Sequence, residues 1–113
     1  MRLSEQQDFA KVFAQGKRIS DSCFTLLGTD NGLECGRLGL AISKKAARRA
    51  TSRNRLKRLA RESFRHHQVT LAGLDVIVMA RPGADRLDSK QLRASLDRHC
   101  EELPGRCKQS SKR

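Results

Sequence analysis

Apolar side chains recur along the chain at spacings that predict a small set of helices and strands. Residues 4 to 14 have helical spacing, and Ser4 is a suitable N-cap for this helix. The apolar stripe, at positions i, i+3 and i+4, is formed by Phe9, Val12 and Phe13. Such a stripe buries one face of a helix against another element.

Three segments have the composition of β-strands. Residues 22 to 28 are apolar and β-branched, residues 37 to 43 alternate between large and small side chains, and residues 74 to 80 are almost continuously apolar. A continuously apolar strand is typical of the centre of a sheet, where both faces are covered. The Asp-Asn-Gly turn within residues 29 to 34 predicts a hairpin between the first two strands.

The strand at 37 to 43 has two unlike faces. One face carries the large side chains of Leu38, Leu40 and Ile42. The other carries only the small side chains of Gly39, Ala41 and Ser43. A small-residue face either lets a ligand backbone approach closely or receives a tightly packed helix. The segment by itself favours neither interpretation.

Two further helices are predicted in the second half of the chain. A long basic helix covers residues 52 to 67, and a last helix begins at Asp88 or Ser89. The last helix is expected to end near Leu103, because a Pro-Gly pair follows it. Residues 105 to 113 are polar and basic, and we expect them to be disordered.

The order of these elements predicts one domain, residues 1 to 104, with the architecture of an α/β sandwich. Strands that alternate with helices build a sheet that the helices cover. The two strands on either side of the basic helix are joined by a crossover connection, so we expect them to be a parallel pair.

The composition indicates a polyanionic partner. The chain has 113 residues, is 37% hydrophobic and carries a formal net charge of +12. Repulsion of that size opposes a compact fold unless anions compensate it. No apolar run reaches the roughly 18 residues of a membrane span. The first residues are too charged for a signal peptide. We therefore expect a soluble, cytoplasmic protein with no membrane partner.

The basic helix is strongly two-sided. On a helical wheel the apolar arc consists of Leu56, Leu59, Ala60, Ser63 and Phe64. The opposite face, which we call the polar ridge, consists of Asn54, Arg58, Arg61 and Arg65. Arg55 and Lys57 flank this ridge, and Arg53 lies near the apolar boundary. One side of the helix is thus expected to pack on the sheet while the other presents cations.

Most of the charge lies in one segment. Residues 44 to 65 contain ten Lys and Arg and a single Glu, so they supply +9 of the total. Guanidinium groups suit phosphate, because each can bind two oxygens at once. A membrane-surface helix would need an accessible apolar face, which the sheet requires here, so nucleic acid is favoured. Asn54 either contacts a ribose, a base edge or a carbonyl that fixes a neighbouring arginine, or it caps a helix that begins near Arg55.

No side-chain cluster in the sequence predicts a metal site or a protein catalyst. Cys23, Cys35, Cys100 and Cys107 form no C-x-x-C pair and are expected to be free thiols. His99 with two of these cysteines lacks a fourth ligand at suitable spacing. The three histidines have no evident carboxylate partner, and His66 and His67 are expected to be solvated at a helix end.

Residues 39 to 65, GLAISKKAARRATSRNRLKRLARESFR, resemble the protein subunit of bacterial ribonuclease P. The family pattern is a strand that ends in Ser-Lys-Lys, a spacer, Arg-Asn-Arg, a hydrophobic residue and Lys-Arg, then two residues, Arg and often Glu. Residues 8 to 18 and 75 to 83 resemble the family's first helix and a later strand. The resemblance covers about residues 3 to 103.

This resemblance implies both a fold and a function. In that family the catalyst is an RNA that removes the 5′ leader of precursor tRNA with Mg²⁺. The protein, one copy per RNA, carries no catalytic residue or cofactor of its own. It binds the catalytic RNA and the single-stranded leader. The fold implied is a mixed sheet of about four strands with three helices, and a left-handed β–α–β crossover against the usual hand.

The resemblance also implies two sets of site residues. RNA contact is expected from Lys44, Lys45, Arg48, Arg49, Arg53, Asn54, Arg55, Lys57, Arg58, Arg61 and Arg65. A leader cleft between the first helix and the sheet is expected from Phe9, Phe13, Thr25, Leu27, Ala41 and Ser43. The two phenylalanines are either stacking platforms for bases or core residues. Strand alternation places Cys23, Thr25 and Leu27 on the cleft face. Many relatives carry an aromatic residue where Leu27 stands.

Two other functions compete with this interpretation. A nuclease that acts without RNA would need clustered carboxylates for metals or a positioned histidine pair. Asp75, Asp85 and Asp88 are the nearest approach to such a cluster. A reader of duplex DNA would pair a recognition helix with a second helix or a dimer, and the sequence predicts neither.

Overall fold

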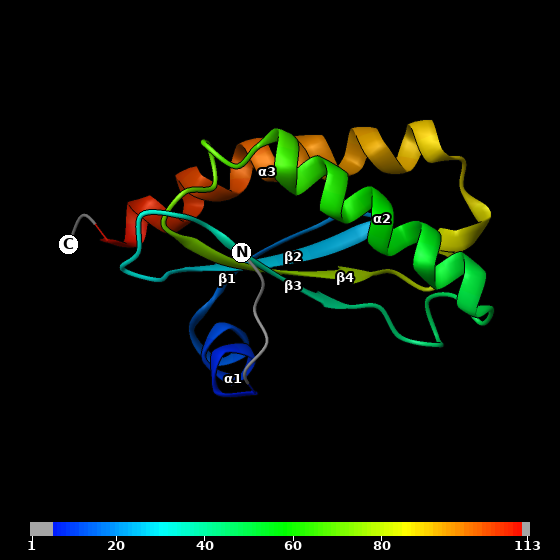
Figure 1. Ribbon diagram of the computed structural model, residues 1–113, viewed down its shortest axis with the longest axis horizontal. Coiled ribbons are helices and arrows are strands. Elements are labelled where there is room, and N and C mark those ends of the chain that lie inside the picture. Colours follow the sequence, from blue (N-terminus) through cyan, green and yellow to red (C-terminus); the bar gives the residue numbers. More distant parts are fainter. Residues whose placement is uncertain (1–5, 112–113) are drawn as a thin grey trace.

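The protein's structure, a computed structural model, describes residues 6 to 111, so the predicted N-cap Ser4 lies outside the described residues. The elements are α1 (Gln6–Gln15), β1 (Lys17–Ser20), β2 (Phe24–Asp30), β3 (Arg37–Ala41), α2 (Ala50–His66), β4 (Leu74–Ala80), the 3-10 helix η1 (Ala84–Arg86) and α3 (Ser89–Ser111). The predicted fold class is confirmed, because these elements form a mixed sheet covered by helices (Figure 1).

The strands lie in the order β1-β2-β4-β3. β4 is antiparallel to β2 and parallel to β3, so it occupies an inner position, as its continuous apolar run predicts. The predicted hairpin between β2 and β3 is wrong, since β4 lies between them. Gly32, at φ 72°, does reverse the chain locally. Strand order, however, is decided by the burial of β4 on both sides, which a turn motif does not report.

β1 was not predicted from the residues. It is an edge strand of four residues with the burial pattern exposed-exposed-buried-exposed, and only Ile19 reaches the core. One apolar side chain gives no periodic signal. Lys17 and Arg18 remain exposed on this edge, where charge discourages pairing with another chain.

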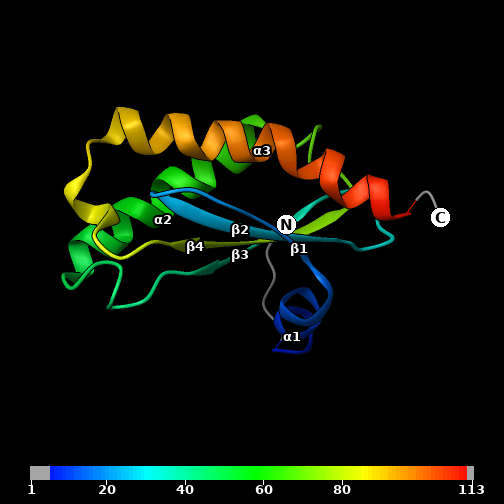
Figure 2. The same cartoon turned by 180° about the vertical axis from the view of Figure 1, so that it is seen from behind.

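The helices divide between the two faces of the sheet (Figures 1 and 2). α2 and α3 cover one face and enclose the larger core, whose fully buried side chains include Phe24, Leu26, Leu56, Leu92 and Leu96. α1 lies on the other face with a smaller core of Val12, Leu27 and Ile77. The alternation of β2 and β4 therefore feeds two cores of unequal size.

The small-residue face of β3 lies on the side of α1. Ala41 packs at the border of the smaller core, beside the half-buried Met79 that is its register partner on β4. Ser43 lies beyond the end of the strand and is exposed. The packing of α1 thus covers part of the small-residue face of β3, and the end of this face at Ser43 stays accessible.

α3 is longer than predicted. The helix continues through Pro104 to Ser111, so the expected end near Leu103 and the disordered tail are wrong for residues 105 to 111. The apolar stripe explains the continuation, because Cys107 follows Leu103 by four residues and both are buried. They pack over Gly28, where an added Cβ would lie 2.8 Å from Leu103 Cδ2. This burial offsets the backbone hydrogen bond that proline removes.

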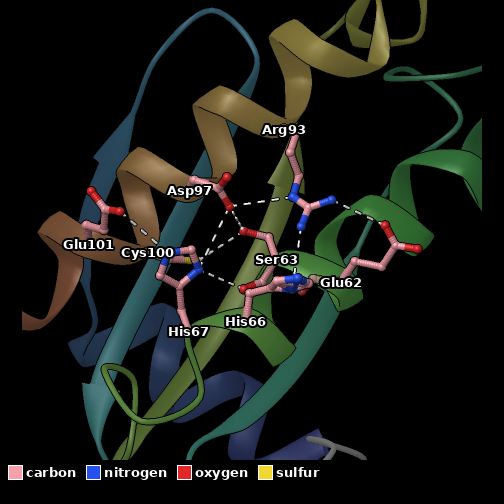
Figure 3. Close-up of polar contacts among 8 residues, drawn as sticks. All are labelled: Glu62, Ser63, His66, His67, Arg93, Asp97, Cys100 and Glu101. Atoms are coloured by element: carbon pink, nitrogen blue, oxygen red, sulfur yellow. Dashed lines mark hydrogen bonds and ion pairs between the residues drawn. The ribbon is translucent and has the colours of Figure 1, made fainter.

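Polar contacts join α2 to α3 (Figure 3). The Ser63 hydroxyl donates to Asp97 Oδ1 at 2.7 Å, and His67 Nδ1 donates to the Ser63 carbonyl at 2.8 Å. The His67 ring is half-buried between Asp97 and Glu101. The expectation of a solvated His67 without a carboxylate partner is therefore wrong. The partners lie on α3, thirty or more residues away in sequence.

Asp21 ties the β1–β2 connection to α3. Its Oδ1 accepts from the backbone N–H of Cys23 and Phe24, and its Oδ2 accepts from Ser95 and Arg98. The turn also rotates Cys23 into the larger core, against the predicted alternation, because β2 begins only at the next residue.

The same carboxylate gives His99 an acidic partner that the sequence did not predict. His99 Nε2 lies 3.3 Å from Asp21 Oδ2. Burial raises the pKa of Asp21, but the hydrogen bonds and the nearby imidazole outweigh it and hold the pKa well below its usual range.

Replacing Asp21 with asparagine is expected to lower the free energy of unfolding at pH 7 by about 1.5–3 kcal/mol, the usual contribution of hydrogen bonds to a charged group. Because the folded-state pKa lies below the ordinary value of 3.8, this stability is present above that pH and is lost as the pH falls below it. Urea unfolding of the variant and of the unchanged protein measures this at pH 7 and at pH 2. Their free energies of unfolding should differ less at pH 2 than at pH 7. Asp30→Asn, at the exposed end of β2, is the matched control. An equal difference in the free energy of unfolding at both pH values would contradict the role given to the Asp21 carboxylate.

Candidate nucleic-acid interface

α2 buries the predicted arc and exposes the predicted ridge. Its buried residues are Leu56, Leu59, Ala60, Ser63 and Phe64. The polar ridge, Asn54, Arg58, Arg61 and Arg65, is exposed along its length. α2 begins at Ala50 with Arg49 as N-cap, so the alternative that Asn54 caps the helix is wrong. Asn54 is instead an exposed amide within a row of guanidinium groups.

The ridge side chains are not neutralised by any residue that the structure describes. Across residues 6 to 111, none of the four forms a hydrogen bond or an ion pair with another described side chain. Glu62, the acidic residue of α2, pairs with Arg93 of α3 at 3.4 Å and does not pair with a ridge arginine. Unpaired guanidinium groups in a row keep their donors available for phosphate oxygens.

A second group of cations lies on the loop that precedes α2. Lys44, Lys45 and Arg48 line an open pocket of about 440 Å³. Their neighbours Ala46 and Ala47 are buried in the larger core and anchor the loop. The first turn of α2, which follows this loop, contains no acidic residue. The free N–H groups at a helix start add to the positive potential there.

The other predicted contact residues differ in exposure. Arg49 is exposed and Lys57 is half-buried on the flank of the ridge. Arg53 Nη1 donates to the carbonyls of Ala47 and Arg48, both at 2.9 Å. Arg55 Nη2 donates to two carbonyls of the η1 segment, both at 3.1 Å. A helical wheel shows neither partner, because both lie on neighbouring loops.

The face of the sheet under α1 is only partly open. Leu27 is 3% exposed and Thr25 is 6% exposed, so these two predicted cleft residues are covered. The Thr25 hydroxyl is hydrogen-bonded to Ser20 on the adjacent strand at 2.7 Å. Val12 fills the space over Leu27. Both residues point to the predicted face, but α1 seals the centre of that face.

The accessible residues lie at the rim of this face. Phe13 is 49% exposed, Phe9 and Ala41 are half-buried, and Ser43 is exposed. Met79 of β4 is half-buried on the same face and was not predicted. The alternation of β4 could have found it, since Ile77 and Met79 share the side opposite Val76 and Val78. The pattern of a continuously apolar strand hides that distinction.

The acidic and sulfur side chains suggest a structural role. Asp75 is 2% exposed and forms a bidentate pair with Arg37, whose Nε and Nη2 lie 2.7 and 2.6 Å from its two oxygens. The four cysteines form no disulfide with one another, as predicted. Burial raises the pKa of Cys100 and of Cys107 to about 11, which keeps both protonated at neutral pH.

Residues 6 to 111 contain neither a candidate metal site nor a candidate membrane span. In this part of the chain, no group of three or more His, Cys, Asp and Glu side chains is arranged to hold a metal ion. No helix among these residues is long and apolar enough to cross a membrane.

A small α/β domain whose charge is gathered on one exposed helix face and its adjoining loop belongs to the class of nucleic-acid-binding proteins. The family described as Ribonuclease P matches residues 1–104. The chain belongs to this family. It is therefore the protein subunit of the ribonucleoprotein that processes precursor tRNA, a component of an endoribonuclease holoenzyme.

Individual relatives agree with the family assignment. The ribonuclease P protein component of Thioalkalivibrio sulfidiphilus is 48% identical over 107 residues, which cover 95% of this chain and 89% of that protein. The RNase P protein from Thermotoga maritima, solved in complex with 1-(4-fluorophenyl)-2-thiourea, superposes with a TM-score of 0.82 at 33% identity, covering 90% of this chain and 99% of that one. The Staphylococcus aureus RNase P protein superposes with a TM-score of 0.79 at 31% identity, covering 86% of this chain and 89% of that one.

Arg58→Ala and Arg61→Ala are each expected to weaken RNA binding and to lower the log–log salt slope by roughly one unit, which is the change expected when a substitution removes one phosphate contact. Asn54→Ala should weaken binding with little change of slope, since an amide releases no counterion. Filter binding to structured RNA over a range of salt concentrations measures both quantities.

Arg18→Ala is the matched control, because it removes an exposed arginine from β1 at the opposite edge of the sheet. Unchanged affinity in all three ridge variants would show that the ridge is not the RNA surface.

Proposed function

We propose that the polar ridge of α2 and the loop with Lys44, Lys45 and Arg48 bind the catalytic RNA of ribonuclease P. The observation that carries this proposal is the row of exposed guanidinium groups, which no carboxylate of the described residues neutralises. Ridge and loop are consecutive in the chain, so they form one extended cationic surface. Such a surface follows a sugar–phosphate backbone and supplies affinity without a large apolar contact.

We further propose that the rim of the α1 face receives the single-stranded 5′ leader of precursor tRNA. Phe13 offers an exposed ring on which an unpaired base can stack. Phe9, Ala41 and Met79 pack against the smaller core and form a half-buried apolar floor on this face, and Ser43 lies between Ala41 and the cationic loop in the chain. A leader bound there would run from the rim toward the lysines.

In this proposal the RNA performs the chemistry with bound Mg²⁺, and the protein contributes binding alone. One copy of the chain acts with one RNA molecule, in the cytoplasm, where precursor tRNA is made. Neutralising phosphates on both RNA molecules brings them together at a lower concentration of divalent ions.

Reconstitution tests the proposed function directly. The protein is combined with the cognate catalytic RNA, and cleavage of precursor tRNA is followed at low Mg²⁺. Cleavage is expected to require both components, with the 5′ leader as the released product. Robust cleavage by the RNA-free protein would overturn the proposal in favour of a protein nuclease.

Phe13→Ala is expected to weaken binding of precursor tRNA by about 1–3 kcal/mol, the usual contribution of one stacked base. A substrate shortened to a one-nucleotide leader should bind both proteins equally. Val69→Ala is the control, because Val69 is 88% exposed on the turn after α2, away from α1. The measurement is the dissociation constant of the reconstituted holoenzyme for each substrate in Ca²⁺, and an equal loss with both substrates would contradict leader stacking.

A further inference from the structure

The half-buried Arg53 side chain folds back onto the loop before α2, whereas its neighbour Asn54 is exposed. Its Nη1 donates to two consecutive carbonyls, those of Ala47 and Arg48, at 2.9 Å each. These carbonyls belong to the loop of residues 42 to 49, which connects β3 to α2. One guanidinium nitrogen thus fixes two peptide groups of the loop.

The inner side of the loop is fixed by other contacts. Ala46 and Ala47 are 2% and 1% exposed, and their N–H groups donate to the Ser43 carbonyl at 3.1 and 3.2 Å. The next two peptides have no such anchor from the core, since Arg48 and Arg49 are exposed. Arg53 supplies the missing contact at the point where the loop turns into α2.

The fixed peptides adjoin the cationic pocket. Lys44, Lys45 and Arg48 line this pocket, and Arg48 carries one of the two carbonyls that Arg53 holds. A carbonyl oxygen bears partial negative charge and repels a phosphate. The Arg53 guanidinium donates to both oxygens and so offsets their partial negative charge.

We propose that Arg53 is a positioning residue for RNA binding. It holds the loop in the conformation that gathers Lys44, Lys45 and Arg48 into one phosphate-binding pocket. This rests on the proposed function of that loop in RNA contact. The pair of carbonyl bonds, and not a phosphate, is then the main partner of the first arginine in Arg-Asn-Arg.

Amide hydrogen exchange of the free protein tests the positioning without RNA. In Arg53→Met, which keeps the aliphatic stem, the N–H groups of Ala46 and Ala47 should exchange about tenfold faster, because the loop opens more easily. The N–H groups of Leu59 and Ala60 in α2 should exchange as before. Arg58→Met is the matched control, because it removes the same charge from the ridge and should leave the loop unchanged.

A mutant cycle tests the consequence for RNA. Arg53→Met is expected to lower the log–log salt slope by about two units or more, since one substitution disperses three loop cations. In a background of Lys44→Ala, Lys45→Ala and Arg48→Ala, the same substitution should have almost no further effect. Arg58→Met should lower the RNA affinity by the same factor in the unchanged protein and in the triple variant.

Each outcome decides the proposal. Unchanged exchange at Ala46 and Ala47, or an equal loss of affinity in both backgrounds, would overturn it, the latter by showing that Arg53 contacts RNA itself. If the triple variant binds RNA normally while exchange still rises, the loop is not an RNA contact and the proposed function fails at this loop, whereas the positioning stands. Should Arg53→Met not fold, Arg53→Lys replaces it, with a side chain one bond shorter and the same coupling expected.

Discussion

The fold and the proposed RNA-binding surface both depend on the packing of one helix stripe against the sheet. Leu56, Ala60 and Phe64 of α2 are buried in the larger core, which also contains side chains of α3. Burying this stripe contributes several kcal/mol from apolar area alone, at about 25 cal/mol per Å². Because the helix cannot rotate without exposing the stripe, its opposite face must lie in solvent. The orientation of the arginines is thus a consequence of hydrophobic burial.

Contacts between the helices keep the cations of the ridge free. Glu62 would be well placed to pair along its own helix, but Arg93 of α3 engages it instead. Asp97 of α3 likewise contacts His67, Ser63 and Arg93, and Glu101 contacts His67. The acidic groups near α2 are therefore drawn to the α2–α3 seam (Figure 3). The result is a separation of charge, with pairs inside the seam and unpaired cations outside it.

The two faces of the sheet divide the work of the protein. The face under α2 and α3 holds most of the apolar core, so it carries most of the stability. The face under α1 holds a core of three buried residues with half-buried neighbours at its rim. A small core with exposed edges leaves Phe13 and the end of β3 accessible, as the proposed leader site requires. The proposed leader site thus lies where the structure leaves side chains uncovered.

The sequence by itself determined the two-sided helix, the central apolar strand and the family. These depend on local periodicity and on motif spacing, which a single chain displays directly. The tertiary structure alone decided the strand order and the edge strand β1. It also decided that α3 continues through Pro104 and that Val12 packs against Leu27 and buries it. It further decided that the side chains of Arg53 and Arg55 donate to backbone carbonyls of neighbouring segments, which a helical wheel does not show. The physical reason is the same in each case: the partner group comes from a distant segment, and no local pattern reports which distant group will be near.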